Sequence, residues 1–136
     1  MRVKVSEIPE EGLTVSRLLD PAQMPLATPE LRFTAPVEVR AAFQRQAETV
    51  LVEVSVTGQT EQVCGRCLEH YSRPYSNRFH LDYSVKGILL LEITDDLRQE
   101  ILLGYPVRFL CREECLGLCP RCGTNLNERS CAHGSA

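Results

Sequence analysis

The sequence predicts an α+β fold in which a β-rich antiparallel sheet carries one or two short helices. Apolar and polar residues alternate over 36–63 and 74–85, as in strands that bury one face and expose the other. Apolar residues recur at helical spacing after residue 93. Residues 111–136 are rich in cysteine but short of apolar residues, so something other than a hydrophobic core must hold them.

The first part of the chain gives the weaker signals. Residues 1–8 alternate and predict a short strand, whereas residues 14–20 predict a brief helical turn. Pro21, Pro25 and Pro29 then punctuate a loop. We assign residues 1–35 to this N-terminal strand and loop.

The strongest strand signals lie in the middle of the chain. Residues 36–46 and 48–57 each alternate, and the second stretch is expected to bury one row of side chains: Val50, Val52, Val54 and Val56. Gly58 and Gln59 predict a turn into a third strand over 60–63. Residues 74–85 predict a further strand, which Gly87 ends, and a short apolar run follows over 88–93.

One helix is expected after this sheet. Thr94 is predicted to be its N-cap, with Asp95 and Asp96 in the first turn. Gly104 and Pro106 are expected to end it. Residues 36–110 would therefore form the antiparallel sheet with the first cysteine pair and one helix, followed by a cysteine-rich tail over 111–136 that packs on the sheet.

The cysteine spacing is typical of a zinc-binding protein. A C-x2-C pair lies at 64–67, and a C-x3-C-x3-C-x2-C run lies at 111–122. Two thiolates three positions apart can bind one tetrahedral ion, and glycine or proline shapes the tight turn between them. The candidate ligands of one or two Zn²⁺ ions are Cys64, Cys67, Cys111, Cys115, Cys119, Cys122, Cys131 and His133.

Spacing alone leaves two partitions of these ligands open. The preferred one joins Cys64, Cys67, Cys111 and Cys115 around one ion and Cys119, Cys122, Cys131 and His133 around a second. The alternative is a single ribbon-like site from Cys64, Cys67, Cys119 and Cys122, with the other ligands weak or empty. In both, the first pair closes a long loop onto the tail.

Composition limits the compartment and the class of partner. Residues 1–20 lack the apolar core of a signal peptide, and no run approaches the ~18 apolar residues of a membrane span. We therefore expect a reduced, cytoplasmic protein that binds no membrane. The net charge of −3 gives no general nucleic-acid footprint.

Arginine is nevertheless the dominant cation, and five arginines lie near the cysteines. Arginine suits bidentate phosphate contacts, which makes these five candidates for nucleic-acid binding. The alternative is that they balance the thiolates, since two filled sites would take the formal charge to about −6. The five are Arg66, Arg108, Arg112, Arg121 and Arg129.

Catalysis finds no support in the sequence. The chain contains no G-x-S-x-G, P-loop or H-E-x-x-H motif. A catalytic zinc keeps an open position, whereas the expected sites are closed and rich in sulfur. We predict a protein that is not an enzyme and has no small-molecule substrate.

Two segments resemble the YceD family of bacteria and plastids, which is named for the accumulation of large-subunit ribosomal RNA. They are CGRCLEHY at 64–71 and LLGYPVRFLCREECLGLCPRCGTNLNERSC at 102–131, within a match that runs from about Pro36 to Cys131. The resemblance implies a role in ribosome biogenesis, with large-subunit ribosomal RNA or a pre-ribosomal protein as partner. The chain departs from the family at Cys131-x-His133, where members often have Cys-x-Cys.

Two other functions compete with this one. The acidic balance favours a zinc-ribbon adaptor that binds another protein, for example in transcription. A thiol redox protein using Cys64 and Cys67 is the third hypothesis, and it requires a reactive thiol of low pKa, which closed zinc coordination forbids.

Overall fold

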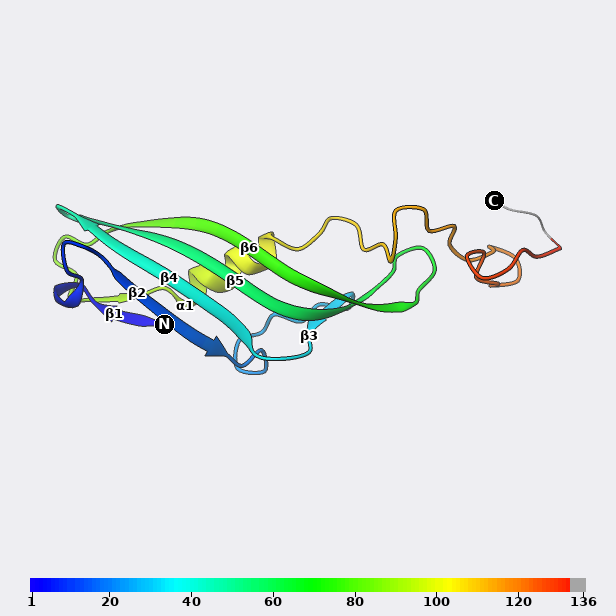
Figure 1. The fold of residues 1–136 in the computed structure, drawn as a ribbon, viewed down its shortest axis with the longest axis horizontal. Helices are drawn as coiled ribbons and strands as arrows, with labels where there is room; N and C mark the ends of the chain where they lie inside the picture. The colour runs from blue at the N-terminus through cyan, green and yellow to red at the C-terminus, as the bar shows by residue number, and fades with distance from the viewer. Residues whose placement is uncertain (133–136) are drawn as a thin grey trace.

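The computed structural model describes residues 1–132 and contains a twisted antiparallel sheet with one helix against its inner face (Figure 1). The strands are β1 (Arg2–Lys4), β2 (Leu13–Leu19), β3 (Leu31–Phe33), β4 (Val37–Gln46), β5 (Thr49–Val63), β6 (His70–Ser84) and β7 (Leu90–Glu92). The helical elements are the short 3-10 helix η1 (Val5–Glu7) and α1 (Thr94–Leu103). The predicted α+β fold is therefore confirmed.

The large sheet is built around β5. One edge of β5 pairs first with β4 and then with β3, and its other edge pairs with β6 along all fifteen residues. Strand β2 extends the sheet beyond β4, and the small β1–β7 pair forms a second sheet. Residues 1–35 thus contribute three strands to the two sheets.

Alternation along β4 and β5 places the core on the inner face of the sheet, as predicted. Val50, Val52, Val54 and Val56 are all buried, whereas Leu51, Glu53 and Thr57 face solvent. Fully burying one such apolar side chain stabilises the fold by about 1.5–3 kcal/mol. Leu97 and Ile101 of α1 pack against this face.

Three details of the predicted secondary structure were wrong. Residues 13–19 form strand β2 rather than a helical turn, because seven residues pair with the exposed edge of β4. The chain does not turn at Gly58, and β5 continues to Val63. The N-cap of α1 is Ile93, and Thr94 is the first helical residue. The Thr94 hydroxyl donates to the Glu92 carboxylate and accepts from the Met1 amino group.

Gly58 lies beside an aromatic ring that fills the space a side chain would take. A Cβ at this position would lie 2.9 Å from Cε1 of Phe33, a buried side chain. Phe33 is itself packed edge-on against Tyr75, with the ring centroids 5.4 Å apart. The glycine is therefore required by close packing.

We predict that Gly58→Ala destabilises the protein by about 1–3 kcal/mol, since overpacking a filled core forces its neighbours to shift. The free energy of unfolding from urea denaturation measures this. Thr57→Ala, at an exposed neighbouring position, is the control and should cost less than about 1 kcal/mol. Equal losses in the two variants would contradict this account of Gly58.

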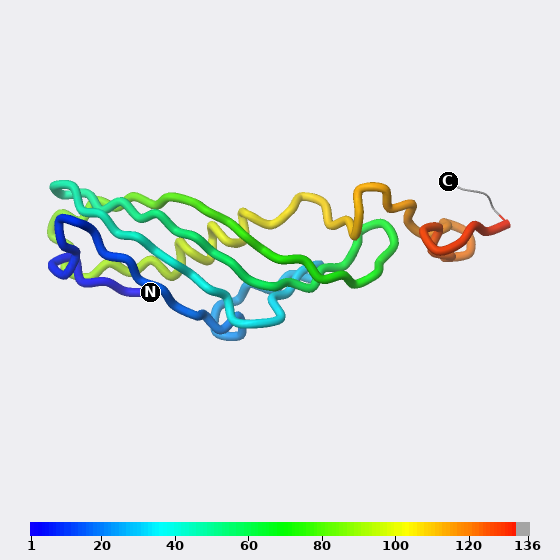
Figure 2. Tube along the Cα trace, in the orientation of Figure 1, coloured from blue at the N-terminus to red at the C-terminus, as the bar shows by residue number. Residues whose placement is uncertain are grey.

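The end of α1 directs the chain toward the cysteines. The helix ends at Gly104, as predicted, and Tyr105 packs edge-on against Tyr75 with a centroid separation of 5.8 Å. The Tyr105 hydroxyl donates to the Leu26 carbonyl at 2.7 Å. From this anchor the chain runs beyond the end of the sheet, where residues 111–132 project (Figures 1 and 2).

Candidate metal centre

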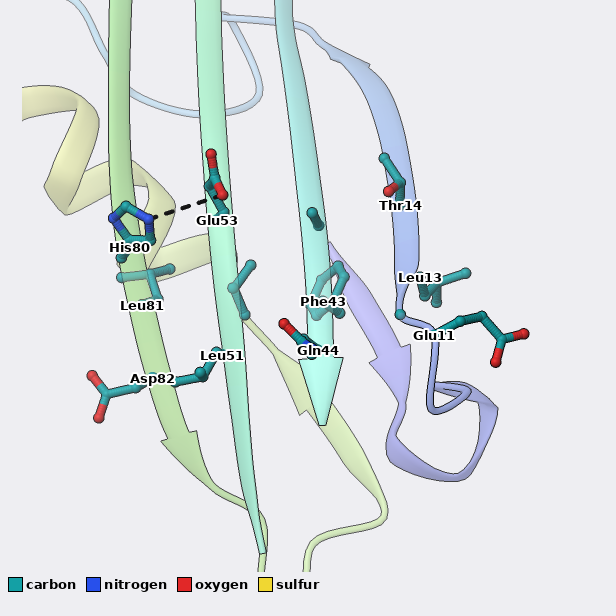
Figure 3. A pocket seen from close by; sticks show the side chains of 13 residues that line it. Glu11, Leu13, Thr14, Phe43, Gln44, Leu51, Glu53, His80, Leu81 and Asp82 are labelled. Carbon is teal, nitrogen blue, oxygen red and sulfur yellow. Dashed lines mark ion pairs between the residues drawn. The ribbon is translucent and has the colours of Figure 1, made fainter. Parts of the chain in front are cut away.

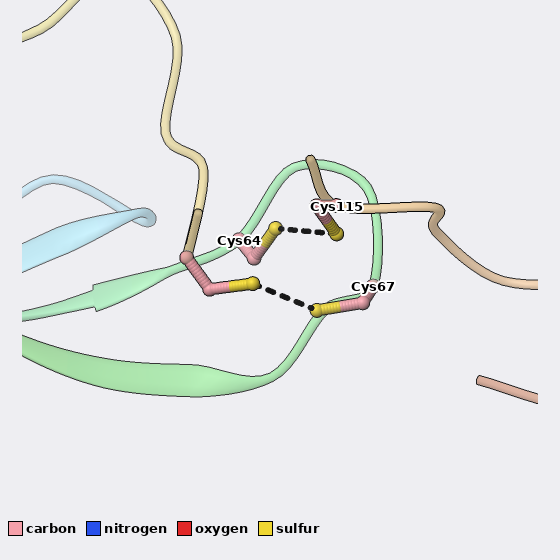
Figure 4. Close-up of side chains that lie close together, drawn as sticks. Cys64, Cys67 and Cys115 are labelled. Carbon is pink, nitrogen blue, oxygen red and sulfur yellow. Dashed lines mark hydrogen bonds between the residues drawn. The ribbon is translucent and has the colours of Figure 1, made fainter. Parts of the chain in front are cut away.

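The first cysteine pair lies in the turn between β5 and β6. The Cys64 amide donates to the Glu69 carbonyl at 2.9 Å, and the Leu68 amide donates to the Cys64 carbonyl at 3.0 Å. Leu68 adopts a left-handed conformation with φ 62°, which is uncommon for a leucine. This compact turn presents both sulfurs at the end of the sheet (Figure 4).

The segment after α1 brings two more cysteines to this turn. The Gly65 amide donates to the Phe109 carbonyl at 2.6 Å, and Arg73 Nη2 donates to the Leu110 carbonyl at 3.3 Å. These bonds hold the residues immediately before Cys111 against the turn over residues 64–67, which we call the first knuckle. Arg66 Nη1 donates to the Cys115 carbonyl at 3.0 Å and fixes the other end of the loop.

The four sulfurs of Cys64, Cys67, Cys111 and Cys115 lie within 4.8 Å of one another. The Cys64 and Cys115 sulfurs lie 3.6 Å apart (Figure 4). The Cys67 and Cys111 sulfurs lie 3.7 Å apart. A tetrahedral ion with metal–sulfur bonds of about 2.3 Å would place its ligands about 3.8 Å apart. The donor set therefore fits a tetrahedral, thiophilic metal ion.

The surroundings of this cluster favour a cation. Cys64, Cys67 and Cys115 are buried, and Tyr71, Leu110 and Leu118 pack against them. Burial raises the pKa of the Cys67 thiol, and the neighbouring sulfurs raise it further. At Cys64, burial also acts to raise the pKa, but backbone N–H donors outweigh it and lower the pKa to about 6. All four sulfurs could be ionised together in this buried space only with a cation between them.

A second cluster joins Cys119, Cys122 and Cys131, whose sulfurs also lie within 4.8 Å of one another. Two backbone hydrogen bonds close the turn that carries this cluster. The Gly123 amide donates to the Cys119 carbonyl at 2.9 Å, and the Cys119 amide donates to the Thr124 carbonyl at 2.8 Å. Backbone N–H groups of Cys122 and Arg121 lower the pKa of the Cys119 thiol. The predicted fourth ligand, His133, lies outside the described residues.

The structure thus groups the seven cysteines as four and three. This is the grouping of the two-ion partition, and Cys64 and Cys67 do not share a group with Cys119 and Cys122. All seven are thiols rather than disulfides. The prediction of cysteine clusters suited to metal ions is confirmed.

The five candidate arginines are exposed around these clusters. Arg66 has a structural contact, since its guanidinium holds the Cys115 carbonyl. His70, near the first knuckle, is paired with Glu61 at 3.0 Å on the surface and is not part of the sulfur group. No helix in residues 1–132 is both long and apolar enough to span a membrane.

A groove of about 550 Å³ lies on the solvent face of the sheet, toward the β4–β5 turn (Figure 3). Its walls come from β2, β4, β5 and β6, and His80 Nε2 lies 4.0 Å from Glu53 Oε2 within it. No cysteine lines the groove. It is therefore separate from both sulfur clusters, which lie at the opposite end of β5.

Several supporting residues were missed by the sequence analysis. Gln62 is buried at the end of β5, accepts from the Tyr71 hydroxyl at 2.7 Å and donates to Thr60 at 3.0 Å. The Arg73 guanidinium lies 5.1 Å from the Tyr71 ring centroid. The alternation of β5 extends inward to Gln62, and this polar residue in a buried row was the available signal.

The fold and the site define a small antiparallel β protein with two cysteine clusters suited to metal ions. An uncharacterized protein of Mycobacterium leprae (strain TN) is 30% identical over 112 residues, which cover 71% of this chain and 52% of that protein. The chain therefore spans about half the length of the curated relative it matches. No family model matches the chain, and no solved structure matches it.

Proposed function

We propose that the chain is a cytoplasmic, non-enzymatic zinc protein that acts in the accumulation of large-subunit ribosomal RNA during ribosome biogenesis. The observation that carries the zinc assignment is the group of four sulfurs within 4.8 Å at the junction of β5, β6 and the C-terminal segment. Four thiolates that can coordinate one ion tetrahedrally favour Zn²⁺ over harder cations, which prefer oxygen ligands.

A structural role follows from how the site is closed. Four protein sulfurs fill a tetrahedral coordination sphere and leave no position for water or substrate. The ion would join the β5–β6 turn to a segment that carries few buried apolar side chains, of which Leu126 is one. Zinc in such a position contributes folding free energy rather than chemistry.

The ribosomal role is supported by the resemblance of residues 64–71 and 102–131 to the YceD family and by the exposed arginines beside the clusters. Arginine at these positions suits phosphate contacts from large-subunit ribosomal RNA. A pre-ribosomal protein is the other partner that this role allows.

A zinc-ribbon protein–protein adaptor is the second candidate, and one observation favours it. Large apolar side chains are exposed next to the first cluster: Val107 is 99% exposed, Leu68 60% and Leu116 58%. Exposed apolar residues that gather around one site suit a protein partner better than a phosphate backbone.

The test is a deletion strain complemented with the wild-type chain or with a Cys64→Ser/Cys67→Ser variant. We expect the deletion to lower large-subunit ribosomal RNA and the free large subunit, and only the wild type to restore them. Normal RNA levels and normal subunit profiles in the deletion strain would contradict the ribosomal role.

A binding experiment separates the two kinds of partner. Direct contact with RNA predicts binding to naked ribosomal RNA fragments that weakens steeply with salt. Capture of a protein partner that survives nuclease treatment would favour the adaptor instead. A reactive Cys64 thiol in the metal-loaded protein would move the thiol redox hypothesis ahead of both.

A further inference from the structure

The two sulfur clusters are connected by one side chain, Asn127. This residue lies in the loop between Cys122 and Cys131, but its Nδ2 donates to Sγ of Cys115 at 3.3 Å. Its Oδ1 accepts from the Leu116 amide at 2.8 Å. A residue of the second cluster's loop therefore supplies a hydrogen bond to a sulfur of the first.

The orientation of the Asn127 amide is fixed by a second asparagine. Asn125 Oδ1 accepts from Asn127 Nδ2 at 2.9 Å and from the Asn127 backbone amide at 3.0 Å. This pair of bonds leaves the remaining N–H of Nδ2 pointing at Cys115.

Backbone contacts tie the loop that carries Asn127 to the two residues before the second knuckle, the turn over residues 119–122. Leu118 and Asn125 form an antiparallel bridge, and the Leu126 amide donates to the Gly117 carbonyl at 2.9 Å. Gly117, at φ +78°, lies against the first knuckle, where a Cβ would be 3.3 Å from the Arg66 carbonyl oxygen. Ordering of the second cluster would therefore position Asn127. It would also hold Gly117, which bonds to the Asn127 loop, against Arg66 in the first knuckle.

A residue that donates a hydrogen bond to a metal ligand affects the affinity for the metal. Loss of such a hydrogen bond typically weakens metal binding about 10–100-fold. Holding Asn127 in place costs conformational entropy, and an ion at Cys119, Cys122 and Cys131 would supply that order before the first site is filled. By linkage, any gain at one site appears equally at the other.

We propose that the second cluster is an effector site for the first, so that the two sites load metal cooperatively with Asn127 as the positioning residue between them. The inference rests on the proposed metal-binding function. It assigns the three-sulfur cluster a role beyond holding the tail: its ion strengthens the four-sulfur site.

The test is a titration of the full chain with Co²⁺ alone. Binding is monitored by the sulfur-to-cobalt charge-transfer absorption, and the affinity of each site is measured by competition with a chelator. A Cys119→Ser/Cys122→Ser variant isolates the first site, and its affinity should be about tenfold weaker than that of the first site in the wild type. An affinity within about twofold of the wild type would overturn the coupling.

Asn127→Leu tests the connection with both clusters intact. The first site should again weaken about tenfold, and adding Cys119→Ser/Cys122→Ser to this variant should cause no further loss. Glu128→Gln, at an exposed position in the same loop, is the matched control. Independent, additive losses would mean that Asn127 does not carry the coupling.

Cadmium NMR supplies a readout that simple loss of stability would not move. The resonance of the ion at the first site should shift in Asn127→Leu and stay in place in Glu128→Gln, because only the first change removes a donor from Cys115.

If the wild type binds no Co²⁺ through sulfur, the metal-binding function itself fails. If two ions bind with unlinked affinities, only the coupling fails.

Discussion

Replacing Cys64 by serine is expected to abolish metal binding at the first cluster and to destabilise the C-terminal segment, residues 111–132, by more than about 4 kcal/mol, as large losses of this kind include the loss of a metal. Cys64 is fully buried, and its sulfur lies 3.6 Å from that of Cys115. Structural zinc contributes about 10–16 kcal/mol of apparent binding free energy in small domains. Part of that stabilisation here would be lost with the ligand.

The Cys64→Ser effect is measured as metal content and as the free energy of local unfolding of residues 111–132, from hydrogen exchange. Cys131→Ser is the comparison, since Cys131 belongs to the three-sulfur cluster and is only partly buried. We expect the smaller loss at Cys131. Equal losses at the two positions would contradict the view that the first cluster is the main structural site.

Removal of metal by a chelator should unfold the C-terminal segment while the sheet persists. The inner face of β4 and β5 is closed by apolar side chains that need no ion, including Val39, Phe43 and Val54. Residues 111–132 rely on turns around the cysteines, such as those closed by the amides of Cys119, Gly123 and Leu126. Without the ion these turns lose their main support.

Hydrogen exchange read by mass spectrometry tests this prediction. Peptides covering 111–132 should lose protection on chelation, and peptides covering 37–63 should keep it. Restoring Zn²⁺ should restore the protection. Loss of protection throughout the sheet, or none in the tail, would contradict the separation of the fold into a self-sufficient core and a metal-dependent segment.

The parts of the fold visible in the sequence were those fixed by local pattern. The valines of β5 alternate, and burial on one face follows directly from that period. Strand β2 was mistaken for a helical turn because its pairing with β4 is a tertiary contact that local spacing does not contain. The β1–β7 pair joins residues about ninety positions apart, so its pairing was likewise not contained in local spacing.

The candidate site divides in the same way. Ligand types followed from C-x2-C and C-x3-C spacing, but spacing left two partitions open because it does not say which knuckles meet in space. In the structure the Gly65 amide donates a hydrogen bond to the Phe109 carbonyl. This bond places the 111–115 loop, rather than the 119–122 knuckle, against Cys64. Asn127 escaped notice because its partner sulfur belongs to the other cluster.

Whether the clusters hold metal is tested most directly by elemental analysis of the protein purified without added metal, combined with a count of reactive thiols before and after chelation. We expect two zinc ions per chain and no reactive thiol until the chelator is added. A metal-free protein in which all seven cysteines react at once would contradict it.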